Sequence, residues 1–181
     1  MSEIKVSAAS EMALNLETRA LDLVRFGANA ATIKDLLGQV PKSAQHELLR
    51  MDHDFKKSRM GKDASFIHQV PEAFPICNKL WAYYSILSDD PAVKQPLRNN
   101  IDKMLDAYAR VFDESSEDIR NHVNFNRFVQ ILHRIGDGTI HIFPCDCGTK
   151  FIGHTERPGS GCAHCRAERI RNRRKAKTAE V

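Results

Sequence analysis

Long apolar runs are missing from this sequence. No stretch reaches eighteen consecutive apolar residues, and the N-terminus lacks the charged start and apolar segment of a secretory signal. The first absence argues against a membrane-spanning helix and the second against export. There is no internal repeat, and 42% hydrophobic residues over 181 positions suffice for one core plus a small appendage. We therefore expect a cytoplasmic protein that does not enter a membrane.

Cysteine is also scarce, and it is unevenly placed. The chain has five cysteines, four of which form two close pairs near the end, Cys145/Cys147 and Cys162/Cys165. Cys77 stands alone among apolar neighbours and is predicted to be a small buried hydrophobe. A disulfide does not suit a chain without a secretory signal, and a redox-active thiol pair does not need a second pair. The paired cysteines therefore favour a metal site.

The two pairs have the composition of zinc knuckles. Each lies among small or turn-forming residues, at 144–148 and 161–165, so that the backbone can turn tightly around one ion held by four thiolates. The stretch around and between them predicts a short hairpin, with strands at 139–143 and 150–153. The usual knuckle is Cys-x-x-Cys, whereas the first pair here is Cys-x-Cys. If one thiolate is released, a neutral imidazole could take its place, from His141, His154 or His164.

The dozen residues after the second pair are strongly basic. Residues 166–177 carry seven cations and one anion, Glu168, which makes a local charge of +6 in a chain whose formal total is +4. The rest of the chain therefore sums to −2. Such a segment favours contacts with phosphates, which weaken steeply as salt rises. A solvated tail, or one that touches acidic protein or a membrane surface, would have the same composition. The predicted DNA-contacting residues of this segment are Arg166, Arg169, Arg171, Arg173, Arg174, Lys175 and Lys177.

Apolar residues recur at helical spacing until about Gly136. The pattern predicts a mainly α fold, a helical bundle with a helix-turn-helix-like N-terminal part and a small C-terminal zinc-ribbon-like module. Residues 115–118 supply the hydroxyl and carboxylate groups of a helix start and are predicted to open the last helix. Residues 55–75 are less regular and are predicted to form a surface loop with a second basic patch. The predicted helices span residues 15–29, 30–37, 42–54, 76–87, 93–112 and 117–135.

Two of these helices resemble a helix-turn-helix. Helices 30–37 and 42–54 are joined by a turn that contains Gly38, and apolar residues surround the joint. A polar face of the second helix would offer Lys42, Gln45, His46 and Arg50 to base edges. A generic helical hairpin would produce the same pattern. The expected domains are a helical domain at 1–136, with the helix-turn-helix-like segment at about 29–54, a four-cysteine zinc module at 137–168 and a basic tail at 169–181.

Several motifs together resemble one family. Residues 23–28 with the helical turn after them, residues 128–134 before a glycine, and the four cysteines with Gly148 and Phe151 before a basic tail are similar to the FlhC family, the C subunit of the bacterial flagellar master transcriptional activator. The likeness runs from about residue 15 to about residue 175, and members of this family also occur on conjugative elements. It implies a mostly helical protein that joins a small FlhD-like partner subunit in a hetero-oligomer, binds promoter DNA and recruits RNA polymerase. It also implies that the four paired cysteines hold one structural Zn²⁺ ion per chain.

We expect no catalytic activity. A four-thiolate site is closed, whereas a catalytic zinc ion keeps one position for water. His154, Glu156 and the second cysteine pair superficially match the zinc nucleobase deaminases, but too few residues separate them for a fold that places the ligands on separate helices. A zinc-containing RNA-binding protein is the other alternative, because composition does not distinguish RNA from DNA as the partner.

Overall fold

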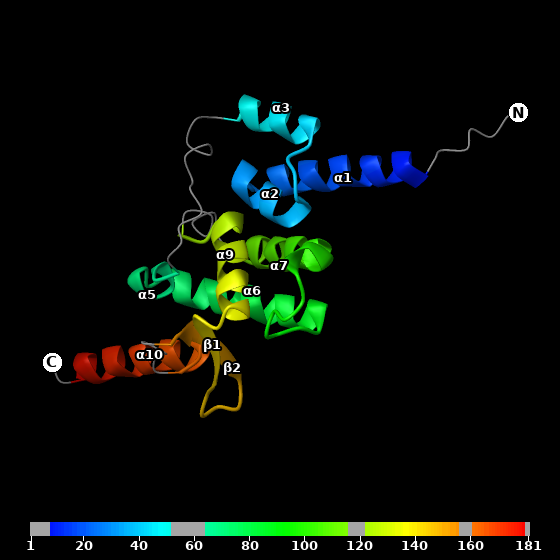
Figure 1. Ribbon diagram of the computed structural model, residues 1–181. Coiled ribbons are helices and arrows are strands. Elements are labelled where there is room, and N and C mark those ends of the chain that lie inside the picture. The colour runs from blue at the N-terminus through cyan, green and yellow to red at the C-terminus, as the bar shows by residue number, and fades with distance from the viewer. Residues whose placement is uncertain (1–7, 52–63, 116–121, 156–160, 180–181) are drawn as a thin grey trace, which may run out of the picture. The chain divides into compact units, whose positions relative to one another are not determined.

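The computed structural model describes residues 8–51, 64–115, 122–155 and 161–179. The chain divides into two compact units, Met1–Gly61 and Lys62–Val181. The described residues are mainly helical and contain one small antiparallel hairpin near the C-terminus, as the sequence predicted. In chain order the elements are α1 (Ala8–Arg25), α2 (Ala30–Leu37), α3 (Lys42–Arg50), α5 (Phe66–Gln69), α6 (Ala73–Ser88), η1 (Leu97–Asn100), α7 (Ile101–Asp113), α9 (Phe125–Gly136), β1 (Ile140–Pro144), β2 (Lys150–His154) and α10 (Ala163–Ala179) (Figure 1).

In the first unit, α1 packs against α2 and α3. The side chains between these helices, among them Leu23, Ile33 and Leu36, are almost completely buried. The Asn29 side chain caps α2 by accepting a hydrogen bond from the Thr32 amide at 2.9 Å, which satisfies one of the unpaired amides at the start of a helix. α1 begins earlier than predicted because its first turns are rich in Ala, Glu, Met and Leu, which favour helix.

The turn between α2 and α3 follows the predicted pattern. Gly38 ends α2 with φ +79°, a left-handed conformation that glycine adopts without a steric penalty. α3 then begins at Lys42 and ends at Arg50, short of the predicted end at residue 54, because Met51 is already extended with ψ 145°. The basic patch predicted at residues 55–62 lies outside the described residues.

In the second unit, α6 contacts α5, α7, α9, β2 and α10 (Figure 1). Its inward side chains include Phe74, Leu80 and Tyr84, each at most 1% exposed. Tyr84 meets Phe128 of α9 edge to face, with ring centroids 6.4 Å apart, and each large side chain buried in this way contributes about 1.5–3 kcal/mol. α6 is therefore the element on which the C-terminal hairpin and α10 are assembled.

The prediction of a loop at 55–75 is wrong for the residues of this range that the structure describes. α5 occupies Phe66–Gln69, and α6 starts at Ala73 instead of residue 76. Pro75 is accommodated because it stands in the first turn of α6, where a backbone N–H has no helical partner to lose. The predicted helix 93–112 also begins too early, since Pro96 precedes η1 and α7 starts only at Ile101.

The continuous helix predicted at 117–135 is wrong as well. Val123 and Asn124 are not helical, and α9 begins at Phe125. The Asn124 side chain accepts a hydrogen bond from the Arg127 amide at 3.0 Å and so caps the start of α9. Residues 116–121 lie outside the described residues. Asparagine is one of the strongest N-cap residues, so a local signal for this start was present.

Candidate metal centre and basic helix

The first cysteine pair lies in a tight turn at the end of the hairpin. The Gly148 amide donates to the Cys145 carbonyl at 2.9 Å, and the Cys145 amide donates to the Thr149 carbonyl at 2.8 Å. Gly148 allows this turn because its φ is +87°, in the left-handed region that favours glycine. The short Cys-x-Cys spacing is therefore compatible with two sulfur atoms that bind the same ion.

The second pair lies at the start of α10. Cys162 immediately precedes the helix and Cys165 stands in its first turn. The Cys162 amide donates to Cys145 Sγ at 3.3 Å, which joins the two knuckles. A Cβ placed on Gly161 would lie 2.7 Å from Arg169 Nη2 and 3.3 Å from Cys145 Sγ. The arginine end is flexible and could move aside, but Cys145 Sγ would have to shift, and the φ of +118° at Gly161 also favours glycine.

The four sulfur atoms form one cluster. Those of Cys145, Cys147, Cys162 and Cys165 all lie within 4.8 Å of one another, and the sulfur atoms of Cys147 and Cys162 are 3.6 Å apart. A tetrahedral zinc site with Zn–S bonds of 2.3 Å requires sulfur atoms roughly 3.8 Å apart. The donor set and its spacing therefore fit a tetrahedral ion that prefers thiolates, and the prediction of a four-cysteine cluster is confirmed.

The histidines considered as substitute ligands are engaged elsewhere. The four cysteines are the one metal-type cluster found among the described residues. The His141 ring stacks on Phe143 with centroids 6.2 Å apart, His164 Nε2 lies 3.8 Å from Glu168 Oε1, and the His154 ring lies edge-on to the His68 ring with centroids 6.4 Å apart. Glu156, the proton shuttle of the deaminase alternative, lies outside the described residues. The geometry therefore favours four thiolates over a mixed ligand set.

The pKa values of the clustered thiols are shifted in opposite directions. A hydrogen bond with the Thr149 hydroxyl, at 2.9 Å from Cys147 Sγ, lowers the pKa of Cys147 to about 6. Cys165 shows the opposite effect, because its side-chain hydrogen bonds to Cys147 and Cys162 raise its pKa to about 12. Four negative charges so close together repel one another unless a cation neutralises them. A metal ion that replaces the shared protons is therefore the chemical complement of this cluster. Nothing in the sequence marks Thr149 for this role, which depends on the turn that brings its hydroxyl back to Cys147.

Two side chains from helices hold the outer edge of β2. Asn78 of α6 accepts a hydrogen bond from the Ile152 amide at 2.7 Å and donates to the Ile152 carbonyl at 3.3 Å. His68 of α5 accepts from the His154 amide at 2.9 Å through Nε2. An open strand edge would otherwise expose these backbone groups. The hairpin is thus fixed to the helices by hydrogen bonds, and neither Asn78 nor His68 carries a sequence signal for this role.

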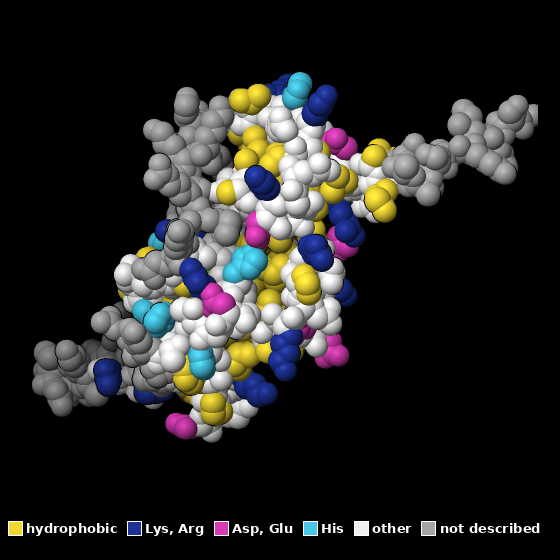
Figure 2. Space-filling view, viewed as in Figure 1, with side chains coloured by type: hydrophobic (Ala, Val, Ile, Leu, Met, Phe, Trp, Pro, Cys, Tyr) yellow, Lys and Arg dark blue, Asp and Glu magenta, His cyan; other side chains and the backbone are white. Residues whose placement is uncertain are grey.

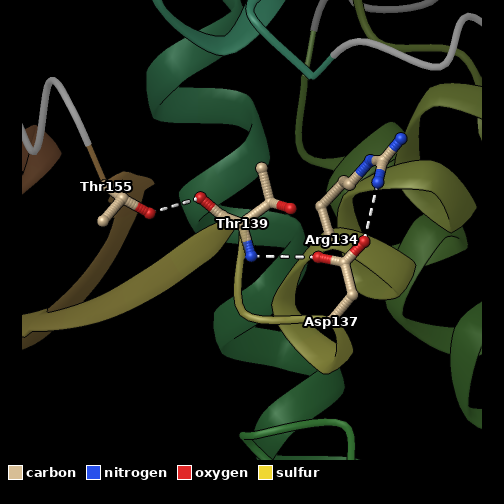
Figure 3. Close-up of polar contacts among 4 residues, drawn as sticks. All are labelled: Arg134, Asp137, Thr139 and Thr155. Carbon is tan, nitrogen blue, oxygen red and sulfur yellow. Dashed lines mark hydrogen bonds and ion pairs between the residues drawn. The ribbon is translucent and has the colours of Figure 1, made fainter.

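The base of the hairpin is tied to the end of α9 (Figure 3). Asp137 uses both carboxylate oxygens: one accepts from Arg134 Nη1 at 2.7 Å and the other from the Thr139 amide at 2.9 Å. On the opposite strand the Thr155 hydroxyl donates to the Thr139 carbonyl at 2.8 Å. Hydrogen bonds from Thr139 and the ion pair with Arg134 lower the Asp137 pKa, although burial alone would raise it. The hairpin that carries Cys145 and Cys147 is therefore fixed at its base as well as along β2.

The predicted basic tail is a helix. α10 spans Ala163–Ala179 and begins within the second knuckle, because its Ala, Arg, Lys and Glu residues all favour helix. Arg171, Arg173 and Lys175 are exposed, and Lys and Arg side chains of the described part of α10 appear at the lower left of Figure 2. The backbone at Arg174 and Lys177 belongs to the helix, but their side chains lie outside the description.

Two of the predicted phosphate contacts lie closer to the body of the unit. Arg166 is half-buried, and its guanidinium carbon lies 5.1 Å from the centroid of the Phe74 ring. Arg169 is exposed along much of its length, but its Nη2 atom folds back to Gly161 beside the cluster. A guanidinium at this place favours negatively charged thiolates. The seven predicted cations thus divide into a pair near the metal centre and a distal set.

The four residues predicted to reach base edges from α3 are all exposed. Gln45 Nε2 donates to the Val40 carbonyl at 2.7 Å, so its side chain closes the turn before α3. Arg50 lies 3.7 Å from Glu47 in an exposed ion pair, which contributes little and exchanges readily. The role of Lys42, Gln45, His46 and Arg50 in DNA contact stays a prediction.

Fold and site together define a mainly helical protein with a zinc-ribbon-like, four-cysteine hairpin. No family model, curated protein or solved structure matches the chain. None of the described helices combines the length and the apolar character needed to cross a membrane. The resemblance to the FlhC family therefore stays a hypothesis carried by the motifs themselves.

Proposed function

We propose that this protein is a DNA-binding subunit of a transcriptional activator and that one structural Zn²⁺ ion per chain orients its basic helix. One observation carries the proposal: α10 starts inside the second cysteine knuckle, so an ion held by Cys162 and Cys165 would also hold the first turn of the helix. The other two ligands, Cys145 and Cys147, belong to the hairpin that Asn78 and His68 fix to α5 and α6. A bound ion would thus join the basic helix to the folded unit.

The zinc ion would act as a cross-link and not as a catalyst. Four thiolates complete its tetrahedron and leave no position for a reacting water. Structural zinc binding is worth about 10–16 kcal/mol in finger peptides, which is more than the whole stability of many domains. Loss of the ion should therefore unfold the hairpin and release α10 from a defined direction.

The distal cations of α10 are suited to a phosphate backbone. The helix has 17 residues and is about 25 Å long at 1.5 Å per residue, a length comparable to several base pairs of DNA. Arg171, Arg173 and Lys175 are exposed, and the sequence adds Arg174 and Lys177 to the same segment. Phosphate contacts fix position and register, whereas sequence choice requires contacts with base edges or DNA bending.

Base contacts would come from the first unit. α3 presents Lys42, Gln45, His46 and Arg50 to solvent, and it follows α2 after a glycine-containing turn, as in a helix-turn-helix. Assembly with an FlhD-like partner subunit and recruitment of RNA polymerase rest on the FlhC-family resemblance. In this proposal the protein has no catalytic step.

The proposal is tested by competition between nucleic acids. The zinc-loaded protein, copurified with its small helical partner, is offered a promoter duplex from the native host, an unrelated duplex of equal length and the corresponding RNA. Selection of the promoter duplex is the expected result. Equal binding to both duplexes would remove the activator function, and preference for the RNA would favour an RNA-binding protein.

The role of α10 is tested by the salt dependence of binding. Replacing its three described distal cations with Gln should reduce the slope of log K against log[salt] by roughly 2.7, at about 0.9 for each phosphate contact. A matched triple variant removes three exposed cations elsewhere in the second unit and should leave the slope unchanged. The test residues are Arg171, Arg173 and Lys175, and the control residues are Lys94, Arg98 and Lys103.

A further inference from the structure

Arg166 differs from the other described cations of α10 in its surroundings. Arg171, Arg173 and Lys175 are exposed, whereas Arg166 is half-buried and lies over the ring of Phe74, 5.1 Å from its centroid. Phe74 belongs to α6 and is only 1% exposed. A guanidinium over the face of an aromatic ring is attracted by the negative charge of that face. Arg166 therefore already has a partner within the protein.

The Phe74 ring is itself held in place. It meets Phe151 of β2 at 6.3 Å and an angle of 62°, and Phe151 meets Phe143 of β1 at 5.7 Å. On another side the His68 ring lies 6.0 Å from Phe74. The aromatic cluster thus joins α5, α6 and both strands. Because its neighbours pack around it, Phe74 offers Arg166 a fixed docking surface.

Because of the position of Arg166 in the chain, its contact with Phe74 restricts the direction of α10. Arg166 directly follows Cys165 in the first turn of α10, and its amide donates to the Cys162 carbonyl at 3.0 Å. A helix held only at the metal knuckle could still pivot about that point. A second contact, between a different residue and a different element, restricts the pivot. The same unit uses such a contact once more, where Arg127 of α9 lies over Phe66 of α5 at 4.9 Å.

We infer that Arg166 is a positioning residue and not a phosphate contact: it docks α10 on Phe74 and so sets the direction in which the distal cations meet the polyanion. Arginine suits this task because its planar guanidinium stacks on an aromatic face while staying charged. The docking is a property of the second unit by itself. Its consequence for DNA binding rests on the proposed function.

The docking is tested first without nucleic acid. In the zinc-loaded full chain, the side-chain Nε–H resonance of Arg166 should show a ring-current shift from Phe74. Phe74→Leu keeps an apolar side chain at the buried site but removes the aromatic face, and it should move this resonance to the position of an unstacked arginine. An Arg166 signal that is the same in both proteins would overturn the inference, whatever the protein binds.

The consequence for binding is tested by a double-mutant cycle. If Arg166 acts by docking, Arg166→Gln and Phe74→Leu should each weaken duplex binding several-fold without changing the salt slope, and the double variant should be no weaker than either single variant. The matched control is Arg173→Gln, an exposed arginine of the same helix, which should lower the slope by about 0.9. A slope reduced equally by Arg166→Gln, or losses that multiply in the double variant, would show that Arg166 contacts phosphate directly and overturn the inference. Absence of duplex binding by the wild-type chain would refute the proposed function instead, and the resonance test would still decide the docking.

Discussion

Replacing Asn78 with leucine should destabilise the second unit, because the Asn78 side chain forms hydrogen bonds with the backbone amide and carbonyl of Ile152 at the buried edge of β2. Asn78 is 8% exposed and makes three hydrogen bonds: from Nδ2 to the carbonyls of Phe74 and Ile152, at 3.0 and 3.3 Å, and at Oδ1 from the Ile152 amide, at 2.7 Å. Ile152 is completely buried. Leucine has a similar size but forms no hydrogen bonds, so the Ile152 amide and carbonyl would lose their partners.

The magnitude follows from these contacts. An unsatisfied buried donor or acceptor costs about 1–3 kcal/mol, and the short bond to the Ile152 amide should dominate over the longer one to its carbonyl. Leucine regains about 1 kcal/mol by burying apolar surface where a polar amide stood. We therefore expect a net loss of about 2–3 kcal/mol in the free energy of unfolding, with an unchanged dependence on denaturant concentration.

Urea unfolding followed by tryptophan fluorescence measures this loss. Trp81 is the single tryptophan and lies buried in α6, so its signal reports on the second unit. The zinc-loaded protein is used throughout, because metal binding adds to apparent stability. Asn99→Leu is the control: Asn99 is exposed in η1, and its replacement should change stability by less than about 0.5 kcal/mol. If Asn78→Leu also stays within that range and the Ile152 amide keeps its protection from hydrogen exchange, the proposed role of Asn78 is wrong.

Three further predictions concern the metal centre and its support. The purified chain should contain about one zinc ion, and a chelator should abolish amide protection in β1 and β2; full protection in metal-free protein would contradict a structural ion. Gly161→Ala should lower zinc affinity several-fold, because its Cβ would lie 3.3 Å from Cys145 Sγ and would push this sulfur atom out of place. The matched control Gly148→Ala, which meets nothing within 4 Å, should cost only the strain of a left-handed residue, about 1–2 kcal/mol, and equal losses of zinc affinity would refute the steric argument. Because the pKa of Asp137 is lowered in the folded protein, its ionised form stabilises the fold above the unfolded-state pKa of about 4, and this stability is lost as pH falls through the folded-state pKa. Asp137→Asn should therefore cost about 0.5–1 kcal/mol at pH 7, and the difference from wild type should vanish in unfolding curves measured in acid. A difference that does not depend on pH would show that the ionised carboxylate is not its cause.

The parts of the fold that the sequence predicted well depend on local patterns. Apolar periodicity located α2, most of α6 and the end of α9, but not the start of α9, because a helix buries one stripe of its own residues. Cysteine spacing located the cluster, since two close pairs require only short turns, and Gly148 allows the first of them. The break in the helix predicted at 117–135 also had a local signal, because Asn124 is a strong N-cap residue and α9 begins directly after it.

The sequence by itself determined that the chain is mainly helical, that four cysteines converge near its end and that positive charge follows them. Only the tertiary structure decided how these parts are joined. Asn78 and Ile152 are 74 positions apart, and Arg166 and Phe74 are separated by an even longer stretch of chain. No pattern within a few residues encodes such pairs, because the contact exists only after the helices have packed. Arg166, Arg171, Arg173 and Lys175 look alike in the sequence, whereas Phe74 of the packed α6 distinguishes Arg166 from the three that are exposed.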